Sequence, residues 1–168
     1  CLYPSYDRCL LSLSRGGADA TVTREFDVTT KSFVKGGFEL PEAKGSAVWI
    51  DRDTVYVQTD FGPGTMTASG YPRIVKEWRR GTPLGEAKVV FEGQMSDISV
   101  NASVAKQKGY PDQHMIRRGV TFYTAEFFLK DPASGKFEKV DLPADAGPGL
   151  VRDLLTITLR SDWKVGGA

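Results

Sequence analysis

The only histidine in this 168-residue chain is His114, in the segment YPDQHMIRR, and it is the obvious candidate for a general base. Hydrolytic serine catalysis needs a nucleophile, a base and an orienting acid within reach of one another. The Gly-x-Ser-x-Gly motif that exposes a nucleophilic serine in many hydrolases does not occur in the sequence. We therefore expect His114 in a loop or at a strand edge, and we expect no catalytic residues in this chain.

The sequence also lacks a complete calcium-binding loop and a complete phosphate-binding loop. The stretch DRDTVYVQTD begins like a calcium loop with Asp51 and Asp53, but Val55 and Tyr56 follow where an oxygen ligand and a glycine belong. The glycine-rich segment GPGTMTASG at 62–70 lacks the Gly-Lys-Ser/Thr ending of a phosphate-binding loop. These patterns predict a hairpin turn and a loop, with no metal and no cofactor.

The two cysteines, Cys1 and Cys9, form neither a zinc-binding spacing nor a Cys-x-x-Cys redox motif. We expect two free thiols, with a disulfide between them as the alternative. The cysteines fix no compartment; we expect a cytoplasmic protein, with the periplasm as the alternative compartment.

Charge and hydropathy argue against two kinds of partner, nucleic acid and a membrane. The chain carries 22 basic and 21 acidic residues, a net charge of +1, so no sequence-wide basic surface is available for nucleic acid. The basic residues near Trp78, namely Lys76, Arg79 and Arg80, and the pair 117–118 are expected to form a solvated rim. No apolar run approaches the roughly 18 residues of a membrane-spanning helix.

A strand pattern recurs along the chain. The segments LLSLSRGG, VYVQTDFG, VNASVAKQ and LTITLRSD start at residues 10, 55, 100 and 155, and each follows a turn that contains aspartate. Small or apolar residues occupy alternate positions in each segment, which is the period of a β-strand. We interpret the four segments as equivalent strands of a repeat.

The remainder of each unit repeats as well. A third strand with glutamate beside an aromatic residue is predicted at 24–27, 76–79 and 125–128, and a fourth at 38–41, 89–93 and 139–143. Helical periodicity is absent apart from the short segment PEAKG at 41–45. Four strands in about 45 residues are typical of a β-propeller blade.

The sequence therefore predicts an all-β fold, a partial propeller of about three and a half four-stranded antiparallel blades in one domain. The predicted blades cover residues 1–43, 44–93 and 94–143, and a half blade covers 144–168. Because the terminal blades leave strand edges unpaired, we also predict self-association.

One connection is longer than a hairpin needs. Residues 60–72 join the second and third strands of the second unit, and long loops of this kind are often functional. Phe61, Tyr71 and Arg73 lie at the ends of this loop, so we select them as candidates for a surface that faces a ligand or a partner domain.

Three stretches carry a resemblance to a known family. The segment from RCLLSLSRGG to FELPEAKG, the hairpin VWIDRDTVYVQTDFGPG, and SGYPRIVKEWRRGTPL resemble the propeller of the prolyl oligopeptidase family of serine peptidases, and the similarity extends to RSDWKVGG. The resemblance implies a parent enzyme in which a seven-bladed propeller pairs with an α/β-hydrolase domain that carries the Ser, Asp and His. None of those catalytic residues falls on this sequence.

The resemblance also implies a role. The propeller of this family caps the active site and admits only short peptides, which are cleaved after proline. We therefore expect a non-catalytic segment whose partners are the catalytic domain and the peptide substrate of the parent. The alternative is a stand-alone, self-assembling propeller that binds a peptide or a glycan.

Overall fold

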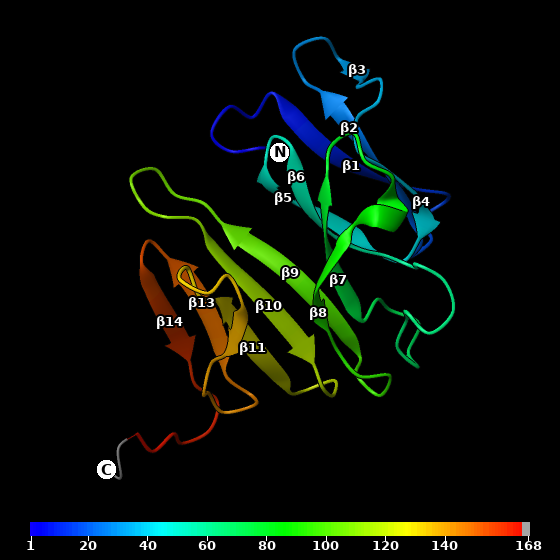
Figure 1. Ribbon diagram of the computed structural model, residues 1–168. Coiled ribbons are helices and arrows are strands. Elements are labelled where there is room, and N and C mark those ends of the chain that lie inside the picture. Colours follow the sequence, from blue (N-terminus) through cyan, green and yellow to red (C-terminus); the bar gives the residue numbers. More distant parts are fainter. Residues whose placement is uncertain (166–168) are drawn as a thin grey trace.

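The computed structural model describes residues 1–165, and these contain β-strands, one 3-10 turn at Leu84–Glu86 and no α-helix. The strands form three four-stranded antiparallel sheets and a terminal pair, which follow one another along the chain (Figure 1). The all-β, partial-propeller prediction is confirmed. Residues 166–168 of the predicted half blade lie outside the described residues.

The first sheet contains β1 (Arg8–Ser14), β2 (Thr21–Asp27), β3 (Ser32–Phe33) and β4 (Glu39–Ala43). Its centre is β2, which pairs with β1 on one edge and with both β3 and β4 on the other. The segment PEAKG, which the sequence marks as the best helical candidate, lies largely in β4. That expectation is wrong because pairing with β2 decides the conformation of this short segment.

The second sheet has the order β5 (Ser46–Asp51), β6 (Thr54–Gln58), β7 (Ile74–Arg79) and β8 (Lys88–Glu92). The third has β9 (Ser99–Ala105), β10 (Gln113–Gly119), β11 (Ala125–Lys130) and β12 (Phe137–Lys139) in sequence order. A terminal pair of β13 (Gly147–Val151) and β14 (Leu154–Thr158) completes the described fold.

Both faces of β6 are buried, which explains its continuous apolar sequence. Val55 and Val57 point into a core shared with the first sheet, which also contains Phe38, Trp49 and Trp78. The intervening Tyr56 points to the other side, into a second core. That core is completed by residues from β7 and the third sheet: Val75, Val100, Ala102 and Ile116. Each sheet therefore covers its neighbour.

Two details of the predicted repeat are wrong. The segment at 100–107 lies in β9, the first strand of its sheet, whereas 55–62 begins in β6, the second strand of its sheet. The equivalent of β6 is β10, because a longer hairpin loop precedes it. The fourth strand of the third sheet is β12 at 137–139, two residues earlier than predicted.

The cysteine prediction is also wrong, since Cys1 and Cys9 form a disulfide. The backbone N–H of Leu2 donates to the carbonyl of Arg8 over 2.7 Å, so the chain folds back on the start of β1. This turn places the first cysteine beside the second. Separately, no helix in residues 1–165 is long and apolar enough to cross a membrane.

Candidate functional site

Loops from different sheets meet at one end of the blades. Because successive antiparallel strands alternate in direction, the connections 59–73, 93–98, 120–124 and 140–146 all emerge at the same end, which we call the crossover end. Backbone hydrogen bonds join them: Ala68 N–H to the carbonyl of Met95 over 2.8 Å, and Ile98 N–H to that of Gly119 over 2.7 Å. The loops after β8 and β10 lie close together in Figure 1.

The loop predicted at 60–72 spans residues 59–73 between β6 and β7, and it is internally ordered. The hydroxyl of Thr65 accepts the N–H of Phe61 over 3.0 Å and donates to the carbonyl of Gly62 over 2.7 Å. The hydroxyl of Thr67 donates to the carbonyl of Ile98 over 3.2 Å, which ties the loop to the next crossover. The loop is therefore a preformed part of the crossover end.

Arg73, one of the three candidate residues, fixes this loop through hydrogen bonds and an ion pair. Its guanidinium donates to the carbonyls of Gly64 over 2.8 Å and Gly93 over 3.0 Å, and it pairs with the carboxylate of Glu92. The side chain is only 17% exposed. These contacts use most of its donors, so Arg73 stabilises the loop.

The other two candidates differ in exposure. Phe61 is half-buried against the first core, with the Lys76 ammonium 4.0 Å from its ring centroid. Tyr71 is exposed, and the Lys44 ammonium lies 4.5 Å from its ring centroid. Of the predicted residues, Tyr71 is therefore the one that presents an aromatic surface at the crossover end.

Sequence reasoning missed four further apolar residues at this end. Met95, Ile98, Phe122 and Tyr123 are exposed, the last two to 80% and 77%. The segment TFYTAEFF alternates poorly and reads as one aromatic-rich strand. Two threonines flank Phe122 and Tyr123 and favour a turn there. This turn signal separates the first aromatic pair from the second pair, at 127–128.

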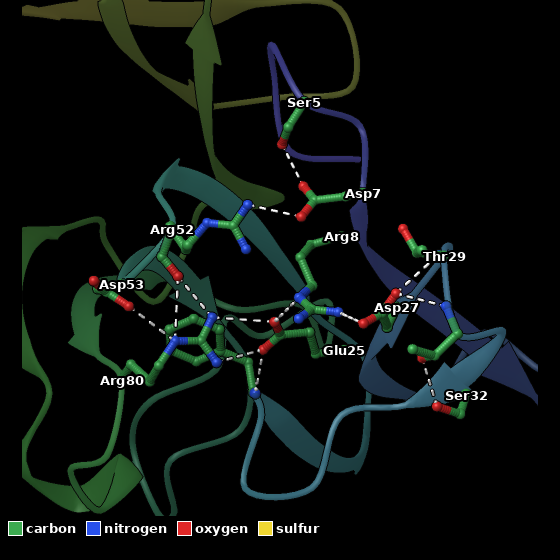
Figure 2. A network of polar contacts seen from close by, with 12 residues as sticks. Ser5, Asp7, Arg8, Glu25, Asp27, Thr29, Ser32, Arg52, Asp53 and Arg80 are labelled. Carbon is green, nitrogen blue, oxygen red and sulfur yellow. Dashed lines mark hydrogen bonds and ion pairs between the residues drawn. The ribbon is translucent and has the colours of Figure 1, made fainter.

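A buried ion-pair cluster joins the first and second sheets at the opposite end (Figure 2). The carboxylate of Glu25 on β2, whose side chain is 1% exposed, accepts two hydrogen bonds from Arg80 over 2.8 and 3.1 Å. It also accepts the N–H of Phe38 over 3.0 Å, and Arg8 lies 3.8 Å away. The pairing raises the pKa of the Arg80 guanidinium. This cluster fixes one blade to the next.

Asp97 and Arg118 form a similar cluster near the crossover end. The Asp97 carboxylate accepts Nε of Arg118 over 2.7 Å and a terminal nitrogen over 3.0 Å, and Arg118 also contacts Glu126 over 2.9 Å. Burial raises the pKa of Asp97, but the Arg118 hydrogen bonds outweigh it and leave this pKa below its ordinary value. The predicted solvated rim is therefore wrong for Arg118, and equally for Arg80.

His114 lies within β10 and faces a tyrosine. Its Nδ1 is 2.9 Å from the hydroxyl of fully buried Tyr56, on the neighbouring sheet. Burial and the nearby Lys130 ammonium lower the pKa of His114 to about 4. A base for serine catalysis needs a nucleophile as its partner, and this imidazole instead bonds a phenol.

Metal binding gains no support from the geometry of this part of the chain. In residues 1–165 no three His, Cys, Asp or Glu side chains gather as metal ligands. The polar clusters instead pair arginine guanidiniums with carboxylates, between the first two sheets at Glu25 and at the third sheet at Asp97. What the crossover end offers is ordered loops and exposed aromatic rings, which suit the binding of another surface.

The chain is similar to two curated peptidases. It is 37% identical to an uncharacterised peptidase of Sinorhizobium fredii over 97% of this chain and 23% of the relative. It is 29% identical to an uncharacterised peptidase of Rickettsia prowazekii over 94% of this chain and 24% of the relative. No protein-family model matches the sequence. The chain thus spans about a quarter of the length of these relatives.

Solved structures agree with the sequence similarity. A post-proline cleaving enzyme from Rickettsia typhi superposes with a TM-score of 0.90 at 30% identity, over 99% of this chain and 26% of that one. A solved prolyl endopeptidase superposes with a TM-score of 0.73 at 13% identity, which supports the fold alone. In sequence and fold the chain therefore matches about a quarter of a post-proline cleaving enzyme, in agreement with the resemblance seen in its sequence.

Proposed function

We propose that this chain is a non-catalytic propeller segment of a post-proline cleaving serine peptidase, in which the propeller covers the active site and restricts access to short proline-containing peptides. The observation that supports this most strongly is the match to the Rickettsia typhi enzyme, with a TM-score of 0.90 at 30% identity. The one imidazole of the chain, His114, is hydrogen-bonded to Tyr56, which supports a non-catalytic role.

The ordered crossover end provides the physical basis for control of access. Loop 59–73 is fixed by side-chain and backbone hydrogen bonds, so it can exclude bulky substrates without first becoming ordered. Exclusion of water from a covered catalytic site would strengthen the electrostatic interactions that stabilise acyl transfer. Tyr71 is the predicted residue best placed to meet a peptide or the catalytic domain.

The full-length product of the native gene tests this proposal. We expect it to cleave a chromogenic peptide after proline, and to cleave short peptides but not the same sequence within a folded protein. The 168-residue chain alone should be inactive. Cleavage by this chain alone that disappears in His114→Ala would overturn the proposal.

A second candidate is a stand-alone binding propeller assembled from two copies, which would recognise a peptide or glycan. The exposed aromatic residues at the crossover end favour it, since carbohydrate and peptide sites commonly contain such rings. The mass of the native gene product discriminates: a product about four times longer than this chain supports the peptidase.

A further inference from the structure

Phe122 and Tyr123 are the most exposed aromatic side chains of the described residues, at 80% and 77%. Their rings contact each other edge to face, with centroids 5.1 Å apart. They lie in the loop between β10 and β11, at the crossover end. Adjacent large aromatic residues exposed to this extent are typical of a contact surface.

The loop that carries these rings is held in one conformation. The Thr121 hydroxyl accepts the N–H groups of Tyr123 over 3.2 Å and Thr124 over 3.1 Å, and the two threonine hydroxyls are 2.7 Å apart. The backbone N–H of Val120 donates to the carbonyl of Thr124 over 3.0 Å. A partner would therefore bind without the entropic cost of ordering this loop.

A hollow of about 440 Å³ lies beside the two rings, between the third sheet and the terminal pair. Its lining includes the apolar residues Ala125, Phe127 and Ala146 and, among its charged groups, Arg117 and Arg160. Neither arginine forms an ion pair with a carboxylate of residues 1–165. The hollow is also lined by Asp145, whose carboxylate accepts a hydrogen bond from the Ser161 hydroxyl. The surface thus offers aromatic anchors, an apolar recess and a balance of two arginines to one carboxylate.

We propose that the Phe122–Tyr123 loop anchors the part of the parent peptidase outside the propeller, through an apolar face flanked by carboxylates. This inference rests on the proposed function: the chain spans only about a quarter of its relatives, and their remaining length would include the other blades and a catalytic domain that covers one end of the blades. Carboxylates are the complement of Arg117 and Arg160. Met95 and Ile98 are also exposed, and they lie in the connection that the Ile98 N–H joins to the carbonyl of Gly119.

Photocrosslinking in the full-length peptidase tests this contact. The photoreactive residue p-benzoylphenylalanine replaces Tyr123 in one variant and Tyr6, which is 57% exposed at the opposite end of the blades, in the control. We expect the residue at position 123 to form an intramolecular crosslink to a peptide outside the propeller, and the residue at position 6 to form none. Crosslinks from position 123 only to propeller strands, only to a second copy, or to nothing would overturn the inference.

A variant gives an independent readout. Phe122→Ala combined with Tyr123→Ala should accelerate limited proteolysis between the propeller and the rest of the chain by about tenfold, as expected for loss of interface hot spots. Val89→Ala, at a residue 54% exposed on β8, is the control and should change nothing. Equal proteolysis rates for all three proteins would contradict the anchor.

The two proposals can fail separately. An inactive full-length protein whose position 123 still crosslinks outside the propeller would remove the peptidase assignment and keep the contact. An active post-proline peptidase without that crosslink would remove only the contact.

Discussion

His114 couples two blades through one hydrogen bond, to Tyr56 on the neighbouring sheet. Burial and Lys130 lower its pKa from 6.5 to about 4, so the folded protein disfavours the imidazolium. The unfolded chain binds this proton more readily. The resulting contribution to stability is complete above pH 6.5 and is lost as the pH falls toward 4.

We therefore predict that the free energy of unfolding decreases between pH 6.5 and pH 5, by up to about 1.4 kcal/mol per pH unit. In His114→Gln this slope should largely vanish, because glutamine does not titrate. Urea titrations at several pH values measure both slopes. Parallel pH profiles for the two proteins would show that another group is responsible.

The Glu25–Arg80 pair supports a second prediction. In Arg80→Ala the Glu25 carboxylate, 1% exposed, would lose its bidentate partner. Removal of one partner of a buried pair costs about 3–5 kcal/mol. Because Arg80 is itself 26% exposed, we expect the lower end of this range.

The adjacent Arg79, exposed at the end of β7, offers a matched control. Arg79→Ala should change the free energy of unfolding by no more than about 0.5 kcal/mol. Chemical denaturation compares the two variants. A similar effect of both substitutions would mean that the pair contributes no specific stability.

Single residues were the least predictable level. The sequence marks Arg80 and Arg118 as basic but does not reveal that carboxylates distant in sequence lie beside them. Cys1 and Cys9 are eight positions apart, and only the fold-back at Leu2 shows that they meet. Such pairings depend on tertiary contacts that a local pattern does not encode.

At the level of elements, the connection from β4 to β5 has room only for glycine at position 45. A Cβ at Gly45 would lie 2.3 Å from the carbonyl oxygen of Gln58 and 2.9 Å from Cα of Thr59, both backbone atoms. We predict that Gly45→Ala destabilises the protein by about 2 kcal/mol or more, because the β4–β5 connection must move away from the end of β6.

Gly85, in the 3-10 turn, has no atom within 4 Å of such a Cβ. Gly85→Ala should therefore alter stability by about 0.5 kcal/mol or less. Thermal unfolding of both variants provides the comparison. A tolerant Gly45→Ala would mean that the crossover can shift without loss of strand pairing.

Elements were predicted well where the chain alternates and turns tightly. The hairpin VWIDRDTVYVQTDFG became β5, a turn at Asp51–Thr54 and β6, because alternation and the acidic turn agree. The segment at 100–107 was assigned to the wrong strand of its blade. Its alternation resembles that of β6, and spacing alone did not reveal the long β9–β10 connection.

For the whole molecule, the first sheet and the terminal pair stand at the two ends of the described row of sheets, and β1 and β14 are edge strands of these two units. Leu154 on β14 is 60% exposed. We predict that the isolated 168-residue chain self-associates through these edges. Sedimentation velocity should show a species larger than the monomer that grows with concentration, and Leu154→Lys should reduce it. A monomer at every concentration would contradict the prediction.

The global architecture was the most predictable level. Four-stranded units and blades buried on both faces follow from the period of two and the repeat, without knowledge of any single contact. The surface at the crossover end did not follow, because exposure of Phe122 and Tyr123 depends on how a short loop projects beyond the sheets.

The Glu25–Arg80 ion pair has a mechanical consequence. Arg80 and Glu25 join the first sheet to the second. In residues 1–165 no ion pair joins the third sheet to the terminal pair. Between these two, the Gln113 amide donates to the carbonyl of Arg152, and the Arg152 N–H donates to the Gln107 side chain. Under tension applied at both ends of the chain, β13 and β14 should peel away first and at low force. The first two sheets should then rupture together, as a single unit.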